Sequence, residues 1–141
     1  MSRVKLQLPE HIDYTTEIDI RISDINYGGH LGNDSVLSLI HEARVRLLKS
    51  KGFSEIDIEG VAIIMVDSII VYSSEGFYGD KIRIDVSVDD ISSTGCDIFY
   101  RLVNTEKNKE IAKAKTGIVF FDYTTKKVAR TPEKFIDLFG N

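Results

Sequence analysis

One segment, residues 34–51, constrains the fold more than any other part of the chain. Its apolar side chains recur three and four residues apart, which is the spacing of one face of an α-helix. We expect Asn33 or Asp34 to cap the start of this helix and Gly52 to cap its end. A helix this apolar has to be wrapped by other elements, so the segment predicts a central helix surrounded by a sheet. The apolar face comprises Val36, Leu37, Ile40, Ala43, Leu47 and Leu48, and the polar stripe comprises Ser38, Glu42, Arg46 and Lys49.

The segments on both sides of this helix predict strands. Residues 14–23 alternate, with Ile18, Ile20 and Ile22 facing one way, as in a half-buried strand. Residues 61–73 are nearly all β-branched or apolar, which indicates burial on both faces or at a subunit contact. The order predicts an α+β fold, with an antiparallel five-stranded sheet around one long helix. The remaining predicted elements are strands over 80–92, 95–106 and 111–123, a turn at 106–110, and a short helix over 131–139 with Thr131 as its N-cap and Pro132 as its first residue.

Composition and charge exclude several classes of function. The 141 residues are 43% hydrophobic and 28% charged, which fits one globular domain over residues 1–141. A net charge of −4 argues against a nucleic-acid partner. Cys96 is the only cysteine and the three histidines lack ligand spacing, so we expect neither a disulfide framework nor a metal site. The chain starts without a signal-peptide pattern and has no apolar run long enough to insert in a membrane, which predicts a cytoplasmic protein.

A polar, glycine-rich loop, "DINYGGHLGN", connects the first strand to the helix. Such a loop costs stability, so it calls for a reason. Gly28, Gly29 and Gly32 either make the turn or let the backbone approach a ligand. His30 has no apolar surroundings in the sequence to explain it, which favours a functional role.

The chain resembles the hotdog-fold acyl-CoA thioesterases related to 4-hydroxybenzoyl-CoA thioesterase over nearly its whole length. The resemblance is carried by "SDINYGGHLGNDS…HEAR", by the Gly79-Asp80 pair before a strand, and by "AKAKTGIVFFDYTTKKVARTPE". It implies a sheet curled around the central helix, in a homodimer or a dimer of dimers. It also implies hydrolysis of an acyl-CoA or acyl-carrier-protein thioester, without a cofactor.

The resemblance implies the following catalytic residues. The family typically has two aspartates before its Gly-His pair, and the second does the chemistry. Asp24 falls on the first position and Asn26 on the second. Because asparagine cannot be a general base or nucleophile, Asp34 at the helix start is the nearest replacement. His30 and Asn26 then position and polarise the reactants, and the backbone near Gly32 supplies the oxyanion site.

Several of these residues also have a purely structural interpretation. Asp34 or Asn33 could only cap the helix, and Asp24 could only shape the turn. Asp67 and Ser68 interrupt an apolar strand that lies near the partner's site in hotdog dimers, so they join Gly28, Gly29, Gly32 and Asn33 as substrate-binding candidates. For Glu42 and Arg44 we favour a structural ion pair or hydrogen bond, and for His41 a role in packing or at an interface. Four lysines could contact CoA phosphates, but we favour a solvated face for them: Lys113, Lys115, Lys126 and Lys127.

Two other functions fit parts of the sequence. "DINYGGH" is similar to the Asp-x-Asn-x-x-His motif of hotdog hydratases and dehydratases acting on enoyl-CoA, but it has one residue too many between Asn26 and His30. The asparagine at the usual aspartate position also suits a non-catalytic protein that binds acyl-CoA or an acyl carrier. Thiol release distinguishes both from a thioesterase.

Overall fold

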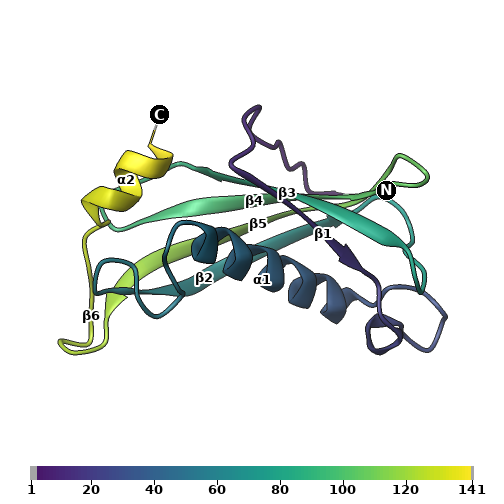
Figure 1. Ribbon diagram of the computed structural model, residues 1–141, viewed down its shortest axis with the longest axis horizontal. Helices are drawn as coiled ribbons and strands as arrows, with labels where there is room; N and C mark the ends of the chain where they lie inside the picture. Colours follow the sequence, from purple (N-terminus) through teal and green to yellow (C-terminus); the bar gives the residue numbers. More distant parts are fainter. Residues whose placement is uncertain (1–2, 141) are drawn as a thin grey trace.

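A single antiparallel sheet curls around the long helix α1 in the computed structural model, which describes residues 3–140 (Figure 1). The two helices are α1 (Asn33–Ser50) and α2 (Glu133–Phe139), and a 3-10 turn, η1, spans Ile22–Asp24. Neither helix of this described range is long and apolar enough to cross a membrane. The strands are β1 (Tyr14–Asp19), β2 (Ala62–Tyr72), β3 (Lys81–Asp89), β4 (Gly95–Asn104), β5 (Lys109–Asp122) and β6 (Lys127–Val128).

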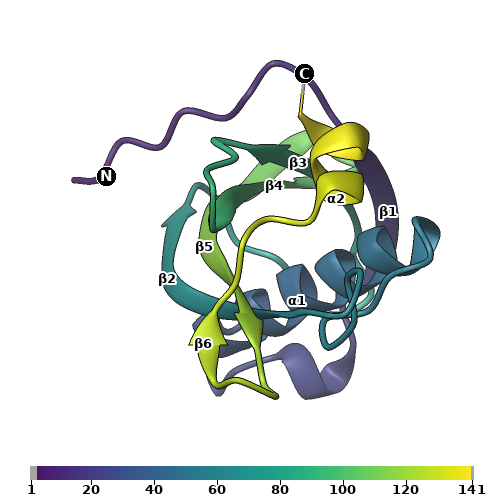
Figure 2. The same cartoon turned by 90° about the vertical axis from the view of Figure 1, so that its left-hand side faces the viewer.

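The strand order is β1-β3-β4-β5-β2, with the two-residue β6 paired to β5. Figure 2 shows α1 inside the curve of the sheet, with β1 and β2 at its two edges. This is the hotdog fold, so the predicted fold class is confirmed, with β6 as a small addition to the five expected strands. β2 is an edge strand, so one of its two hydrogen-bonding edges has no neighbouring strand within residues 3–140.

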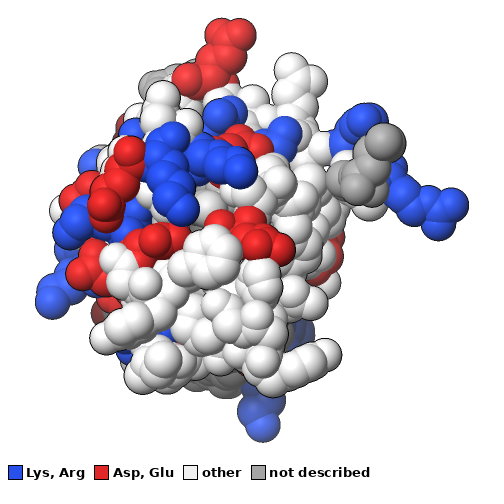
Figure 3. Space-filling model, turned by 90° about the vertical axis from the view of Figure 1, so that its right-hand side faces the viewer, with Lys and Arg blue, Asp and Glu red and all other residues white. Residues whose placement is uncertain are grey.

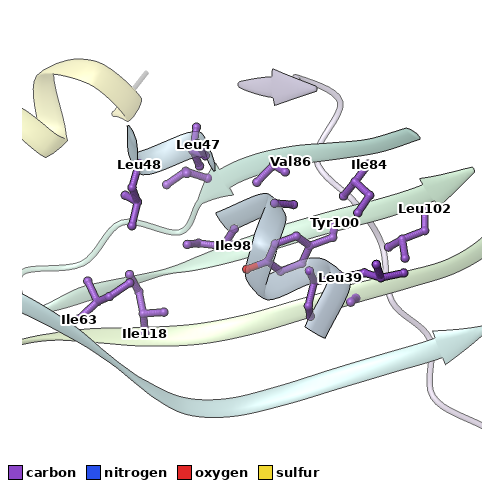
Figure 4. Close-up of a cluster of buried hydrophobic side chains, with 14 of the residues drawn as sticks. Leu39, Leu47, Leu48, Ile63, Ile84, Val86, Ile98, Tyr100, Leu102 and Ile118 are labelled. Atoms are coloured by element: carbon purple, nitrogen blue, oxygen red, sulfur yellow. The ribbon is translucent and has the colours of Figure 1, made fainter. Parts of the chain in front are cut away.

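The core lies between α1 and the inner face of the sheet. Alternate residues of β3 and β4 point inward, as their period of two requires. Figure 4 shows these side chains packed against Leu39 and Leu47 of α1. Each large apolar side chain that becomes fully buried stabilises the fold by about 1.5–3 kcal/mol. The inward residues of the two strands include Ile84, Val86, Ile98, Tyr100 and Leu102, all at most 1% exposed.

Two predictions about α1 are corrected. The helix begins at Asn33 with Gly32 as its N-cap, and no side chain caps its first turn, so neither Asn33 nor Asp34 serves as the cap. Leu37 is 45% exposed, whereas Leu39 is 2% exposed. The reason is that the sheet of one chain covers only part of the helix circumference. Gly52 lies just after the C-cap residue Lys51, with the positive φ of 80° that suits glycine there.

Two other boundaries and the burial of one strand differ from expectation. The first strand ends at Asp19, and Ile22 is 71% exposed because the chain turns into η1 there. Pro132, not Thr131, is the N-cap of α2, since the Thr131 hydroxyl donates to the Ser92 carbonyl instead. Of the two interpretations of segment 61–73, burial on both faces within one chain is wrong, because the central residues 66–68 of β2 are exposed along the free edge of the sheet; a subunit contact stays a prediction.

Candidate active site

The loop between η1 and α1 is anchored by Asp24, which is only 3% exposed. Its carboxylate accepts hydrogen bonds from the Arg21 backbone N–H at 2.8 Å and from the Arg21 guanidinium at 3.2 and 3.3 Å. Its carbonyl accepts the Gly32 N–H at 2.9 Å. Both carboxylate oxygens are therefore occupied, and Asp24 joins the two ends of the loop.

Asn26 folds the centre of the loop. Its side-chain oxygen accepts hydrogen bonds from the backbone N–H groups of Gly28 at 3.0 Å and His30 at 3.2 Å. Its backbone N–H donates to the His30 carbonyl at 2.8 Å. The turn needs glycine at position 29, where φ is +84°. Within the described residues the amide nitrogen of the Asn26 side chain makes no hydrogen bond and is free to meet a ligand.

His30 lies between this loop and a second one, residues 73–80, which we call the supporting loop. Its Nδ1 atom lies 3.0 Å from Oε2 of Glu75, and its ring contacts that of Phe77 with centroids 5.4 Å apart. Neither Glu75 nor Phe77 was singled out from the sequence. The only signal was their position just before the Gly79-Asp80 pair of the motif.

The supporting loop is fixed to the rest of the site through its backbone. The Leu31 N–H donates to the Gly76 carbonyl at 2.8 Å, and the Ile20 N–H donates to the Asp80 carbonyl at 2.9 Å. A Cβ on Gly76 would lie 2.8 Å from the Ile20 side chain and 3.2 Å from the Leu31 Cβ, so a larger residue there would force these neighbours to shift. The supporting loop thus holds the chain on both sides of the polar loop, through Gly76 at Leu31 and through Gly79 and Asp80 at Ile20.

Asp34 is exposed, and among residues 3–140 no hydrogen bond or ion pair occupies its carboxylate. The side chain folds back along the start of α1, so that its Oδ1 lies 2.7 Å from the position that a Cβ on Gly32 would take. That same position is 3.6 Å from the Asn26 Cβ. Asp34, Gly32 and Asn26 therefore lie together, and His30 is bonded to Asn26 on the other side.

The start of α1 also presents free backbone donors. The first helical N–H groups to donate are those of Ser35 and Val36, both to the Gly32 carbonyl. Within the described chain the N–H groups of Asn33 and Asp34 have no acceptor, as expected for a helix N-terminus. Such groups can stabilise an oxyanion next to the Asp34 carboxylate.

Asp67 and Ser68 do not contact this loop within one chain. Asp67 accepts hydrogen bonds from Lys115 at 2.9 Å and from the Gly117 N–H at 3.0 Å on the outer face of the sheet. The hydrogen bond from Lys115 lowers the pKa of Asp67 below its ordinary value. Ser68 pairs in register with Thr116 on the inner face.

The ion pairs of α1 are structural, as predicted. Arg44 is 6% exposed and donates to Glu55 at 2.8 Å and to the buried Tyr100 hydroxyl at 3.0 Å. Burial works against the charged form of Glu55, but the hydrogen bonds and charges of Arg44 and His41 outweigh it, so the pKa of Glu55 lies below its ordinary value. Glu42 pairs with Arg46 on the surface.

The end of the molecule that carries the polar loop is charged on one half and largely uncharged on the other (Figure 3). Exposed apolar side chains of Ile22, Tyr27 and Tyr78 belong to the loops at this end. The lysines of the turn into β6 lie at the opposite end of the same chain (Figure 1). No group of three or more His, Cys, Asp or Glu side chains that could hold a metal ion occurs in the described part of the chain.

Comparison with known proteins agrees with this architecture. The family model described as "Thioesterase-like superfamily" matches residues 20–139. The 1,4-dihydroxy-2-naphthoyl-CoA thioesterase of Synechocystis is similar in structure, with a TM-score of 0.82, 21% identity, and 91% of this chain and 96% of that chain covered. The DHNA-CoA thioesterase of Staphylococcus aureus gives a TM-score of 0.77 at 24% identity, covering 87% and 83%. No curated protein matches the chain. Since the family model spans most of the sequence, the protein belongs to the thioesterase-like superfamily of hotdog-fold thioester hydrolases.

Proposed function

We propose that the protein hydrolyses an acyl-CoA thioester at the N-terminus of α1, with Asp34 as the general base. The observation that carries this proposal is a carboxylate without a partner in the described chain, placed beside the free N–H groups of Asn33 and Asp34. A carboxylate that caps its own helix would be occupied, but Asp34 caps nothing. The other aspartate of the motif, Asp24, has both oxygens committed to Arg21.

The reaction follows from these groups. Asp34 takes a proton from a water molecule as the water oxygen bonds to the thioester carbonyl carbon. The N–H groups at the start of α1 stabilise the resulting oxyanion. The carbon–sulfur bond then breaks, the acyl group leaves as the free acid, and the thiolate takes up the proton. His30 and the free amide nitrogen of Asn26 position the water and the carbonyl oxygen.

Asp34 has a second possible role as a nucleophile, in which its oxygen attacks the carbonyl carbon and forms an anhydride. After a single turnover in ¹⁸O-labelled water, label in the protein would identify the nucleophilic role. General-base catalysis puts the label only in the released acid. An anhydride that water opens at the Asp34 carbon puts it in the protein.

We propose CoA rather than a carrier protein as the thiol group, because the named structural neighbours act on CoA thioesters. The single cysteine, Cys96, is buried and free, which suits the reducing cytoplasm as the location. Rates with one acyl group on CoA and on an acyl carrier protein decide between the two carriers. A higher kcat/KM for the carrier protein would contradict the choice of CoA.

We propose that the functional unit is a homodimer joined through β2, or a dimer of such dimers. The free edge of β2 offers unpaired backbone groups, and long open edges tend to be paired. Apolar Val66 and Leu37, which are 58% and 45% exposed, lie on β2 and on α1. In such a dimer Asp67 and Ser68 would lie near the active site of the partner subunit. We propose that they contact the substrate bound there.

The activity is tested by free-thiol release from acyl-CoAs of varied chain length. A thioesterase releases thiol well above background. Loss of the conjugated absorbance of a 2-enoyl-CoA without thiol release would instead identify a hydratase. Tight acyl-CoA binding with no turnover would identify a binding protein, and the asparagine at position 26 would then explain the missing activity.

A further inference from the structure

Among residues 3–140, Glu75 is the one acidic side chain placed against His30, and it comes from a loop that the proposed mechanism does not otherwise use. Its Oε2 atom lies 3.0 Å from Nδ1 of His30. That nitrogen is buried and makes no hydrogen bond in the described chain, so its contact with Glu75 is an ion-pair contact whose geometry falls short of a hydrogen bond. A contact of this kind between a carboxylate and a histidine nitrogen tightens readily when a ligand binds.

The backbone builds this pair into the fold. Leu31 and Gly76, the residues that follow His30 and Glu75, are joined by the hydrogen bond from the Leu31 N–H to the Gly76 carbonyl. The Ser74 hydroxyl holds the other side of Glu75 by donating to the Glu110 carbonyl at 2.6 Å. The two side chains therefore face each other because their main chains are fixed, even though Glu75 itself is exposed.

The ring of His30 is oriented as well. Phe77 contacts one side of it, and a Cβ on Gly28 would lie 3.4 Å from its Cδ2 and 4.0 Å from its Nε2. The His30 side chain is 35% exposed while its Nδ1 is covered, so the exposure belongs to the other ring atoms. The Nε2 edge thus lies beside the glycine loop.

A neutral imidazole carries one N–H, and a carboxylate beside one nitrogen draws the proton to that nitrogen. We propose that Glu75 is a positioning residue that keeps the proton of His30 on Nδ1, so that Nε2 accepts a hydrogen bond from the attacking water. One hydrogen of that water then points to His30 and the other goes to Asp34. No proton moves to Glu75. This inference rests on the proposed thioester hydrolysis.

The experiment combines nitrogen NMR of the histidine ring with kinetics. In the free enzyme at about pH 8.5, where imidazole is neutral, the His30 resonances show which nitrogen is protonated; the variant His30→Ala assigns them. Histidine free in water favours the proton on Nε2. We expect Nδ1–H in the wild type and a shift toward Nε2–H in Glu75→Ala. Glu106→Ala, which removes a charge from the neighbouring hairpin, is the control and should leave the tautomer unchanged.

In the kinetic arm, Glu75→Ala should lower kcat by about 10- to 100-fold, the range found when a carboxylate that orients a metal-bound histidine is removed, with KM little changed. In the His30→Ala background the same substitution should have no further effect. An Nε2–H tautomer in the wild type would overturn the proposal, and so would an equal loss in both backgrounds. If no variant, the wild type included, releases thiol, the hydrolase proposal fails, but the tautomer measurement still decides the role of Glu75.

Discussion

Replacing Gly32 by alanine should displace the Asp34 carboxylate without unfolding the protein. The added methyl carbon would lie 2.7 Å from Asp34 Oδ1, whereas ordinary contact begins at 3.4 Å, so the carboxylate has to retreat by about 0.7 Å. The next nearest atoms, the Asn26 Cβ at 3.6 Å and the Asp24 carbonyl oxygen at 3.7 Å, already lie at ordinary contact distance. The strain therefore falls on one flexible, exposed side chain.

The effect on stability should be small for two reasons. Gly32 has φ −75° and ψ 153°, a conformation that alanine adopts without strain. Alanine is a poorer N-cap than glycine, at a cost of up to about 1 kcal/mol. It also restricts the unfolded chain, which stabilises by roughly 0.4–1 kcal/mol. These contributions nearly cancel, so the free energy of unfolding should stay within about 1 kcal/mol of the wild type.

Activity should respond much more strongly. A misplacement of about 1 Å in a reacting group can cost about 10²-fold, so we expect kcat to fall roughly 10- to 100-fold. The assay is free-thiol release from an acyl-CoA, run beside a thermal melt. In the Asp34→Asn background, where no general base remains to be moved, Gly32→Ala should cost nothing further. A folded Gly32→Ala variant with wild-type kcat would refute the placement of Asp34, and so would an equal loss in both backgrounds.

Three further predictions concern stability and assembly. Glu55→Gln removes the charged partner of buried Arg44 and should lower the free energy of unfolding by about 2 kcal/mol, measured as a fall in Tm of roughly 5–10 °C. Because folding lowers the pKa of Glu55, the stability that this group contributes is present above its unfolded pKa of about 4.3 and is lost as pH falls through the lower folded value. Glu55→Gln should lack this loss of stability when it is titrated with acid. An acid-unfolding profile equal to that of the wild type would contradict the role of Glu55 as the charged partner of Arg44. Gly29→Ala forces a side chain into φ +84° and should cost about 1–2 kcal/mol in chemical denaturation, whereas a neutral effect would show that the loop relaxes. Val66→Lys should convert a dimer, twice the chain mass by light scattering, into a monomer of unchanged fold; a wild type of single-chain mass would exclude the proposed dimer.

Much of the fold was predictable because it depends on local periodicity. The strands predicted over 80–92 and 95–106 contain β3 and β4, and helical spacing located α1 to within one residue at each end. The predictions failed for side chains whose exposure depends on how distant elements pack around them. Leu37 matches the apolar spacing, but the sheet does not reach around to its side of the helix. Ile22 continues the strand alternation, but the chain has already turned into η1.

The site was predictable only within the loop itself. Asp24, Asn26 and the glycines interact with residues close in sequence, so the motif was enough to bring them together. The loop also predicted a special role for His30, but not its partner. Glu75 and Phe77 reach it from a distant segment through the turn after β2, which no local pattern could reveal. The lack of a side-chain cap on α1 follows from the helix beginning at Asn33, which puts glycine at the N-cap position.

The most direct test of the proposed mechanism is free-thiol release by Asp34→Asn compared with the wild type and with Asp137→Asn, an exposed aspartate on α2 far from the site (Figure 1). Asparagine keeps the shape of the side chain, and the Asp34 charge at the helix N-terminus contributes less than about 1 kcal/mol, so all three proteins should melt at similar temperatures. We predict that Asp34→Asn lowers kcat by about 10²- to 10⁴-fold, the usual contribution of a general base, while Asp137→Asn keeps the wild-type rate. Wild-type turnover by a folded Asp34→Asn variant would contradict the assignment of Asp34 as the catalytic carboxylate.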